Sequence, residues 1–401
     1  MNVRFKMSRI IVSLTSYPSR IRDISKVLDS IMVQTYLPDK VVLYLSEKQF
    51  PKRKLPVDLS AYFTLGLEIH WCQDDMKSHK KYLYAFKEYP KDSIITIDDD
   101  VYYEKHMIEE FVQCIDKYPQ CILARRTHLI TIENDGSISP YERWWGECLH
   151  YIGIPRMDLF AVGCGGILYP PNLLTQEVLN TDSIKKHCMY ADDIWLKVME
   201  LISGIPVVQV QTRILDRFNK EFAQDGLYQH YNGNGGNDRS FHHILGIYDY
   251  SVGPRKELVR KLFSTGIVHE NEIIQGRKND NIRLVEECIG SIGRDTGIVI
   301  YGAGTVARRV YNALDKYKRT NKIRAFLVED TNKNASNFKD IKVVQYKDAD
   351  YENVVCIIAV ADLEEQYRIS LQLVAVGVRE SQIRFLNYWM LGGLQDLMDA
   401  G

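Results

Sequence analysis

The sequence predicts two α/β domains, each built around a doubly wound sheet. Apolar strand-like runs alternate with amphipathic helical segments over the first part of the chain, and a second alternation begins near Gly297. With 401 residues the chain is too long for one ordinary domain. We therefore expect a first domain over residues 1–250, a polar helical connector over 251–290, and a smaller domain over 291–401.

The first domain is predicted from β-branched runs and helical periodicity. The expected strands are 10–14, 41–45, 67–72, 94–97 and 121–124, and the expected helices are 21–31, 79–89 and 107–115. Four strands with helical crossovers indicate a parallel sheet. From about 125 to 250 the pattern is irregular and rich in aromatic residues and glycine, which is typical of loops that build a site.

The second domain begins with a strand at 298–301, a glycine turn over 302–307 and then a helix to about Tyr317. Further strands are expected at 323–328, 354–360 and 383–386. Gly302, Gly304 and Ala307 fit a dinucleotide-binding fingerprint, and Glu329 lies near where an acid would meet an adenosine ribose. Because no redox site follows, we favour a regulatory or assembly role with a glycine turn kept for tight packing, and NAD is not the expected cofactor.

Composition excludes several classes of protein. A net charge of −1, from 51 basic and 52 acidic residues, argues against a general nucleic-acid binder. The eight cysteines form no C-x-x-C pair, and Cys72 and Cys356 fall in predicted strands, so we expect reduced thiols in a cytoplasmic protein. The sequence has neither an apolar run near the roughly 20 residues of a membrane span nor a signal-peptide core at its polar N-terminus.

Three consecutive carboxylates, Asp98, Asp99 and Asp100, follow the strand predicted at 94–97. Along a continued strand, Asp98 and Asp100 would share one face and Asp99 the other. Ligands of open α/β sheets bind beyond the carboxyl ends of the strands. Two carboxylates there suit a hard divalent cation that holds a diphosphate, and a solvated acidic turn is the alternative.

The first half resembles GT-A-fold nucleotide-sugar glycosyltransferases, in particular the bacterial inverting enzymes that build surface polysaccharides. The second half is similar to small Rossmann-like domains appended to polysaccharide-biosynthesis enzymes. The resemblance implies a GT-A-type doubly wound mixed sheet plus a smaller Rossmann-like α/β domain. The matching positions occur in the family's order: Thr15, Ser16, Tyr17 and Arg20; Asp74 and Asp75; Asp98 to Asp100; Gly163 to Gly166; and Asp192 with Asp193.

The resemblance implies a role for each group. The residues after the first strand would hold the nucleotide, Asp74 and Asp75 would contact the base, and the acidic triplet would stand in the place of the metal-binding D-x-D. Asp100 would bind Mn²⁺ or Mg²⁺ directly, while Asp98 would contact the ribose or a metal-bound water. A late histidine, for which we prefer His242, would complete the metal site, with a surface turn as the alternative.

The catalytic base would come from Asp192 or Asp193, and Asp193 is preferred because the family's base is usually the second acid. The alternative is that both cap a helix predicted over 194–202. Lys80, in the basic segment 77–81, suits a diphosphate at a helix N-terminus, although a solvated basic face fits equally well.

Acceptor binding is predicted on the glycine loop, including Gly165 and Gly166, and on the aromatic faces of Trp144 and Trp145, whose competing interpretation is an ordinary core. Residues 254–263 form a basic amphipathic stretch. It could rest on an anionic membrane surface as a peripheral contact, and we prefer that it packs between the domains. The glycine-rich segment 232–238 is predicted as a mobile loop.

The leading hypothesis is a metal-dependent inverting glycosyltransferase with a nucleotide-sugar donor, uridine nucleotides being the commonest in this group, and a saccharide or lipid-linked saccharide acceptor. No nucleic acid is expected as a partner, and assembly into a homo-oligomer is left open. The competing hypotheses are an NAD-linked oxidoreductase or epimerase centred on Gly302, and a non-catalytic sugar-nucleotide binding protein.

Overall fold

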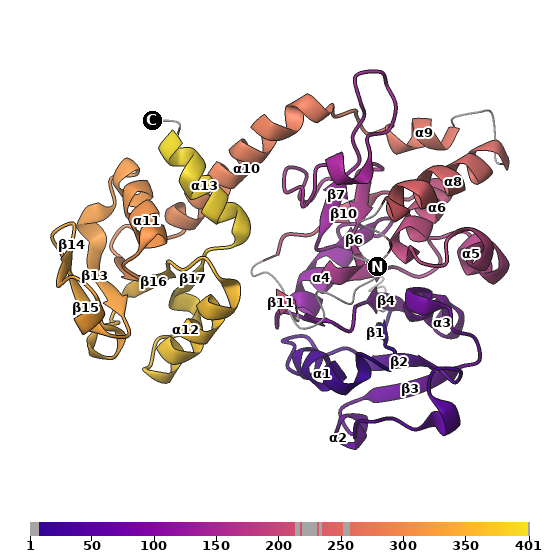
Figure 1. Ribbon diagram of the computed structural model, residues 1–401, viewed down its shortest axis with the longest axis horizontal. Coiled ribbons are helices and arrows are strands. Elements are labelled where there is room, and N and C mark those ends of the chain that lie inside the picture. The colour runs from indigo at the N-terminus through magenta and orange to yellow at the C-terminus, as the bar shows by residue number, and fades with distance from the viewer. Residues whose placement is uncertain (1–7, 213–216, 219–230, 232–234, 252–256, 400–401) are drawn as a thin grey trace, which may run out of the picture. The chain divides into compact units, whose positions relative to one another are not determined.

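The computed structural model describes residues 8–212, 217–218, 231, 235–251 and 257–399. Contacts divide the chain into two compact units, Met1–Ile273 and Ile274–Gly401. The division falls inside helix α10 (Glu270–Gly290), within the segment expected to connect the domains (Figure 1). Each unit holds its own mixed, mostly parallel sheet, which confirms the predicted fold class.

The main sheet of the first unit has seven described strands in the order β10-β6-β9-β4-β1-β2-β3. All neighbours are parallel except β9, which runs antiparallel to β4 and β6. The carboxyl ends of β1 to β4 therefore meet the beginning of β9 at one edge. The strands are β1 (Ile10–Thr15), β2 (Lys40–Ser46), β3 (Leu67–Cys72), β4 (Ser93–Thr96), β6 (Ile122–Ala124), β9 (Ile167–Tyr169) and β10 (Val207–Gln209).

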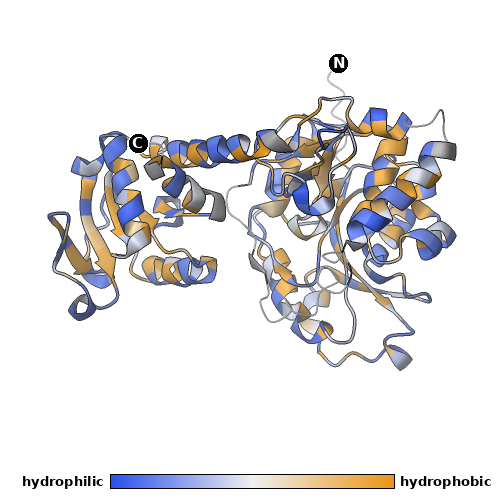
Figure 2. Ribbon diagram, turned by 45° about the horizontal axis from the view of Figure 1, so that its top comes forward, coloured by the Kyte–Doolittle hydropathy of each residue, from blue (hydrophilic) through white to orange (hydrophobic). Residues whose placement is uncertain are grey.

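Helices cover both faces of this sheet. The apolar side chains of α1 and α4 pack on one face, and those of α3 and α6 pack on the other. Strands are mainly hydrophobic, whereas the helices keep a hydrophilic face (Figure 2). The helices are α1 (Ile24–Met32), α2 (Ser60–Phe63), α3 (Lys80–Glu88), α4 (Met107–Ile115), α5 (Thr181–His187), α6 (Asp192–Ser203), α8 (Gly236–Ser251) and α9 (Glu257–Leu262).

Two short antiparallel ribbons complete this unit. The first pairs β5 (Val101–Tyr102) with β11 (Arg217–Phe218), and the second pairs β7 (Thr127–Leu129) with β8 (Leu159–Ala161). The strand β3 and the helix α4 have the bounds that the sequence predicted.

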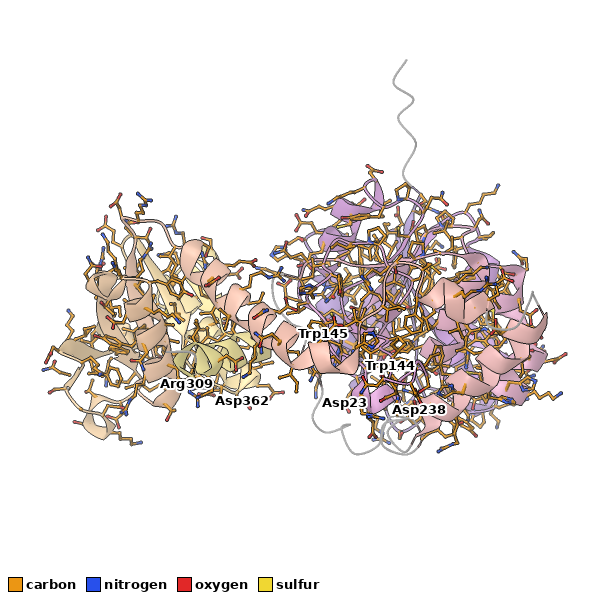
Figure 3. All side chains as sticks on the ribbon, turned by 90° about the horizontal axis from the view of Figure 1, so that it is seen from above. Asp23, Trp144, Trp145, Asp238, Arg309 and Asp362 are labelled. Atoms are coloured by element: carbon orange, nitrogen blue, oxygen red, sulfur yellow. The ribbon has the colours of Figure 1, made fainter. Side chains whose placement is uncertain are left out.

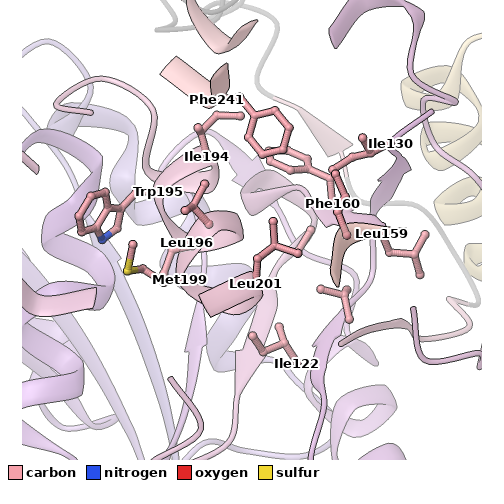
Figure 4. Close-up of a cluster of buried hydrophobic side chains, with 14 of the residues drawn as sticks. Ile122, Ile130, Leu159, Phe160, Ile194, Trp195, Leu196, Met199, Leu201 and Phe241 are labelled. Carbon is pink, nitrogen blue, oxygen red and sulfur yellow. The ribbon is translucent and has the colours of Figure 1, made fainter. Parts of the chain in front are cut away.

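A large apolar cluster holds α6 in place (Figure 4). Ile194 and Trp195, directly after the acidic pair, are at most 1% exposed, and they pack in one cluster with Phe160 of β8 and Phe241 of α8. Burying side chains of this size stabilises the fold by about 1.5–3 kcal/mol each. Because the first turn of α6 is anchored in this way, the backbone that carries Asp192 and Asp193 has a defined position.

The prediction of irregular loops over 125–250 is wrong for much of that region. Besides the helix expected after the acidic pair, which is α6, it contains α5 and the 16-residue α8. The buried residues Phe241, Ile244, Leu245 and Tyr248 of α8 follow helical spacing, but the glycine-rich start obscured the period. Residues 232–234 of the glycine-rich segment lie outside the described residues, and 236–238 belong to α8.

The second unit has a six-stranded sheet among its described residues, in the order β14-β15-β13-β12-β16-β17. All pairs are parallel except β14 with β15. Helices α10, α11 and α13 pack on one face and α12 on the other. The elements are β12 (Gly297–Tyr301), α11 (Thr305–Lys316), β13 (Ile323–Val328), β14 (Asn337–Phe338), β15 (Ile341–Gln345), β16 (Val354–Ile358), α12 (Leu363–Ala375), β17 (Ile383–Phe385) and α13 (Tyr388–Asp399).

The basic amphipathic stretch packs its apolar side inside the first unit. Within it, α9 places Leu258 and Leu262 in the core, both 0% exposed, and Phe263 packs against the same cluster. The apolar stripe is therefore not available to a membrane surface, which corrects the peripheral-contact interpretation. Residues 254–256 lie outside the described part. Among the described residues, no helix combines the length and hydrophobicity needed to cross a bilayer.

Candidate functional site

The acidic triplet lies in a turn rather than on a strand. β4 ends at Thr96, and Asp99 and Asp100 form a turn before β5. The predicted alternation of side chains is therefore wrong: Arg20 reaches both Asp99 Oδ1, at 3.0 Å, and Asp100 Oδ2, at 2.8 Å. Asp98 is held from another side, since Lys81 Nζ lies 2.6 Å from its Oδ1. The triplet divides into one carboxylate paired with Lys81 and two paired with Arg20.

Asp99 is a buried anchor, not an exposed ligand. It is 6% exposed, accepts a hydrogen bond from Ser16 Oγ at 2.6 Å, and pairs with Arg20. Ser16 is itself 2% exposed. A direct contact of Asp99 or Ser16 with a donor, as the resemblance implied, is therefore not what this packing presents. Instead, these two residues orient Arg20, whose guanidinium reaches Asp100.

The remaining residues after β1 have local roles. Thr15 Oγ1 donates a hydrogen bond to the Tyr44 carbonyl at 2.8 Å, which ties β1 to β2. The Tyr17 ring lies beside the Arg20 guanidinium, whose Cζ atom is 5.5 Å from the ring centroid. Because Tyr17 is half-buried, part of its ring is open to solvent next to the triplet. Of the four residues predicted here to hold a nucleotide, Tyr17 and Thr15 retain some exposure, whereas Ser16 and Arg20 are buried.

Asp74 and Asp75 follow β3 at the same edge of the sheet and differ in burial. Asp74 lies between Lys48 and Lys185, at 3.0 and 2.8 Å, and hydrogen bonds from these two lysines lower the pKa of Asp74 to about 2. Asp75 pairs with Lys80, 2.9 Å away. Lys80 is 2% exposed, so neither the predicted diphosphate contact nor a solvated basic face describes it. It neutralises Asp75.

Asp192 and Asp193 begin α6, as predicted, and their carboxylates have different partners. Asp192 accepts a hydrogen bond from Ser78 Oγ at 2.8 Å, and its Oδ2 lies 3.0 Å from Lys81 Nζ as an ion pair. Asp193 Oδ2 accepts the backbone N–H of Gly163 at 2.9 Å. Its Oδ1 is buried and has no hydrogen-bond partner within the part of the chain that the structure describes. Neither carboxylate caps the helix, because Ala191 is the N-cap residue.

The two carboxylates also differ electrostatically. Burial and the adjacent negative charge of Asp192 raise the pKa of Asp193 to about 8. The pKa of Asp192 is lowered: burial opposes ionisation most strongly, but the Lys81 ammonium, His79 and the Ser78 hydroxyl together outweigh that effect. A pair of carboxylates that are pushed in opposite directions is typical of acid–base sites.

The structure brings two residues into the centre of the site: Lys81, to which sequence reasoning gave no role, and Gly163, which it named only as part of the glycine motif. Lys81 contacts both groups of carboxylates, through Asp98 and Asp192. Gly163 touches Asp193 through its N–H. The available signal for Lys81 was its place in the basic segment, where the neighbouring Lys80 was chosen instead. Only packing distinguishes the two lysines, because adjacent helical residues point in different directions.

The glycine loop reaches the site because β9 is antiparallel. Ile167, the first residue of β9, pairs with Thr96, the last of β4, so the loop lies beside the triplet. Gly166 has a φ of +81°, which favours glycine. A Cβ on Gly165 would lie 2.5 Å from Arg126 Cβ. Backbone conformation and close packing account for Gly165 and Gly166, which were predicted as acceptor contacts.

Trp144 and Trp145 belong to the core. Both are labelled in the first unit in Figure 3. They are 2% and 4% exposed, and Trp144 packs against Phe160 and Phe241. The Trp144 indole N–H donates to the Ser139 carbonyl at 2.7 Å. The ring faces are covered by protein and are not presented to a sugar, so the core interpretation replaces the acceptor-stacking one.

His242 is exposed on α8, and none of its recorded contacts reaches the triplet. Within the described residues, no group of three or more histidine, cysteine or acidic side chains is arranged to hold a metal. The structure thus does not bring His242 to the triplet, and the metal set of Asp98, Asp100 and His242 stays a prediction. The two carboxylates still fit a divalent cation, because their side chains are 29% and 26% exposed. Mg²⁺ commonly binds through one or two carboxylates while substrate phosphates and water complete its shell.

The glycine turn of the second unit has a structural explanation. Gly302 has a φ of +116°, and a Cβ there would lie 3.0 Å from the Ala359 carbonyl oxygen. Glu329, the acid predicted near a ribose, pairs with Arg368 of α12 at 2.7 Å. The turn is therefore needed for close packing, and the Glu329 carboxylate is engaged by an arginine.

The chain matches no protein-family model and no curated protein. Among solved structures it is similar to crystal structures of TarS from S. aureus. One, of residues 1–349 in complex with UDP, matches at 14% identity and a TM-score of 0.33, over 52% of this chain and 59% of that one. Two others match at 12% identity, one with a TM-score of 0.32 over 71% and 44% of the chains, the other with 0.34 over 78% and 88%. The matched region thus spans less than two thirds of the first two TarS chains.

Proposed function

We propose that this protein is a metal-dependent, inverting glycosyltransferase. It would move a sugar from a nucleoside-diphosphate donor, uridine being the first base to test, to a saccharide or lipid-linked saccharide acceptor in cell-surface polysaccharide synthesis. The observation that carries the proposal is the convergence of two acidic groups at one edge of the sheet. Asp98 and Asp192, 94 positions apart in sequence, both contact the Lys81 ammonium.

The donor end of the site consists of Asp98, Asp100 and Arg20. Asp98 and Asp100 would hold Mn²⁺ or Mg²⁺, which neutralises charge that develops on a leaving diphosphate. Arg20 is fixed by its pairs with Asp99 and Asp100. The Arg20 guanidinium partly neutralises the repulsion between Asp99 and Asp100. These two carboxylates can therefore lie side by side before any cation binds.

The acceptor end consists of the pair at the start of α6. Inversion by direct displacement needs a carboxylate that takes the proton of the acceptor hydroxyl as the new bond to the anomeric carbon forms. Asp193 Oδ1 is an acceptor oxygen that no described residue hydrogen-bonds. The raised pKa of Asp193, about 8, suits a group that must take up a proton near neutral pH.

The direct test is calorimetric titration of the full chain with UDP, GDP, CDP, ADP and NAD, each with and without Mn²⁺. We expect one nucleoside diphosphate to bind in the presence of Mn²⁺ and to bind at least tenfold more weakly without it. A metal-independent response to NAD alone would overturn the proposal and favour an oxidoreductase. Binding of a diphosphate with no release of it from any sugar nucleotide would favour a non-catalytic binding protein.

A further inference from the structure

Lys81 is a buried lysine whose contacts extend to both ends of the acidic cluster. It is 3% exposed, and its Nζ lies 2.6 Å from Asp98 Oδ1 and 3.0 Å from Asp192 Oδ2. A Cβ added to Gly163 would lie 3.1 Å from the same nitrogen. An ammonium has three N–H donors. One is donated to Asp98 Oδ1, the ammonium also forms an ion pair with Asp192 of α6, and the glycine loop lies beside it.

The backbone of Lys81 is fixed as firmly as its side chain. Its carbonyl accepts a hydrogen bond from Ser13 Oγ, in the central strand β1. The neighbouring Lys80 is equally buried but pairs with Asp75, away from the acidic pair of α6. The two lysine side chains therefore point in different directions. Of the two, Lys81 is the one that contacts Asp98 and Asp192, which belong to the proposed site.

The contacts of Lys81 make the acidic pair of α6 unequal. Asp192 is held by the Lys81 ammonium and by Ser78 Oγ. Among the described residues, Asp193 accepts one hydrogen bond, from the Gly163 N–H to Oδ2, and its buried Oδ1 accepts none. Asp192 Oδ2 also accepts no hydrogen bond, but it faces the Lys81 ammonium 3.0 Å away. An acceptor hydroxyl that enters the site can donate to Asp193 Oδ1 without displacing an existing partner. To use Asp192 it would have to compete with a cation.

We propose that Lys81 is a positioning residue that ties the donor-side Asp98 to Asp192 and, by occupying Asp192, leaves Asp193 as the carboxylate that takes the acceptor proton. The inference rests on the proposed function and decides between two candidate bases that the sequence leaves open. The opposite pKa shifts of the two carboxylates agree with this division. In the transfer step the hydroxyl proton passes to Asp193, the hydroxyl oxygen bonds to the anomeric carbon, and the bond from that carbon to the diphosphate breaks.

The first test compares two isosteric variants, Asp192→Asn and Asp193→Asn, by release of nucleoside diphosphate from the sugar nucleotide that binds. Asp193→Asn should lower kcat on the order of 10²–10⁴-fold, as expected for the loss of a general base. The fold loss in kcat for Asp192→Asn should be at least ten times smaller than the loss for Asp193→Asn. A larger loss in Asp192→Asn would overturn the assignment. Both variants keep the shape of the side chain, so both should bind the nucleoside diphosphate with Mn²⁺.

The second test is a double-variant cycle with Lys81→Met and Asp193→Asn. If Lys81 acts through the availability of Asp193, the double variant should be no slower than Asp193→Asn alone, within about threefold, because groups that act as a unit are not additive. Losses that multiply would show an independent role and overturn the proposal. So would a Lys81→Met enzyme that keeps its full kcat.

Lys197→Met is the matched control. Lys197 is also a buried lysine, 1% exposed, and pairs with Glu200 on α6 without contact to the acidic pair among the interactions recorded for the described residues. It should lose thermal stability as Lys81→Met does and keep kcat within about threefold. If Lys81→Met does not fold, the Asp192 and Asp193 comparison still decides the assignment. Failure of every variant and of the native chain to bind a diphosphate would instead count against the proposed function itself.

Discussion

Gly163→Ala is the change whose effect the geometry predicts most directly. A Cβ at this position would lie 2.7 Å from Asp193 Oδ1 and 3.1 Å from Lys81 Nζ. The backbone of Gly163 is not in the left-handed region, so alanine fits the local conformation. The new methyl group must therefore push the carboxylate, and the effect on activity reports the position of Asp193.

The size of the effect follows from the distances. An ordinary contact of a Cβ begins at 3.4 Å, so the Asp193 oxygen has to move by 3.4 − 2.7 = 0.7 Å. A displacement of about 1 Å at a reacting group can cost about 10²-fold in rate, and we expect kcat to fall about 10- to 100-fold. Weakening of the Gly163 hydrogen bond to the carboxylate would cost about 1.5–3 kcal/mol. The stiffer unfolded chain would offset about 0.4–1 kcal/mol of this cost.

The assay is release of nucleoside diphosphate from the sugar nucleotide identified by titration, together with the binding of that diphosphate and urea unfolding. Gly246→Ala is the control, since Gly246 lies on α8 and a Cβ there would meet nothing within 4 Å. That variant should keep kcat and gain up to about 1 kcal/mol in stability. An unchanged kcat in Gly163→Ala, or an equal loss in diphosphate binding, would refute the placement of Asp193 at the reacting end.

Asp100→Ala should abolish the Mn²⁺-dependent part of diphosphate binding, whereas the control Asp135→Ala, in an exposed turn, should keep it. If calorimetry finds that the two variants bind the diphosphate with equal affinity in Mn²⁺, Asp100 is not part of the metal site. Because the pKa of Asp193 is raised to about 8, kcat/KM should rise as pH increases through 8, and a flat profile between pH 6 and 9 would argue against Asp193 as the base. The raised pKa also means that the folded protein binds the Asp193 proton more tightly than the unfolded chain does, where the pKa of Asp is about 3.9. The contribution of Asp193 to the free energy of unfolding is therefore present below pH 4 and is lost as pH rises through 8. Leu258→Ala, in the core at 0% exposure, should destabilise the fold by about 2–5 kcal/mol in urea unfolding, whereas a loss below 1 kcal/mol would show that this side chain contributes little to the core.

Local patterns were sufficient where one element decides its own structure. The run of apolar residues at 67–72 forms β3, and the helical spacing at 107–115 forms α4, each with the predicted bounds. Both signals come from burial of one face or of a whole strand, and these are properties of neighbouring residues. A helix over 194–202 at the acidic pair was likewise predicted, and α6 begins two residues earlier, at Asp192.

These sequence patterns did not predict which polar and aromatic side chains are exposed. Trp144, Lys80 and Asp99 were candidates for ligand contact, and all three are buried. Their side chains carry aromatic faces or charges that a ligand could use. However, a sequence does not say whether another part of the chain already uses them. Here Phe160, Asp75 and Arg20 do.

The sequence by itself determined the two α/β units and the helix at the acidic pair. It also determined that Asp98 to Asp100 lie beyond the carboxyl end of a buried strand. Only the tertiary structure decided that Lys81, and not Lys80, joins Asp98 to Asp192, and that Asp193 keeps a buried oxygen without a partner. Secondary structure follows from short-range periodicity. The partners of a buried charge depend on segments more than 90 residues apart, which meet only when β9 enters the sheet antiparallel to β4.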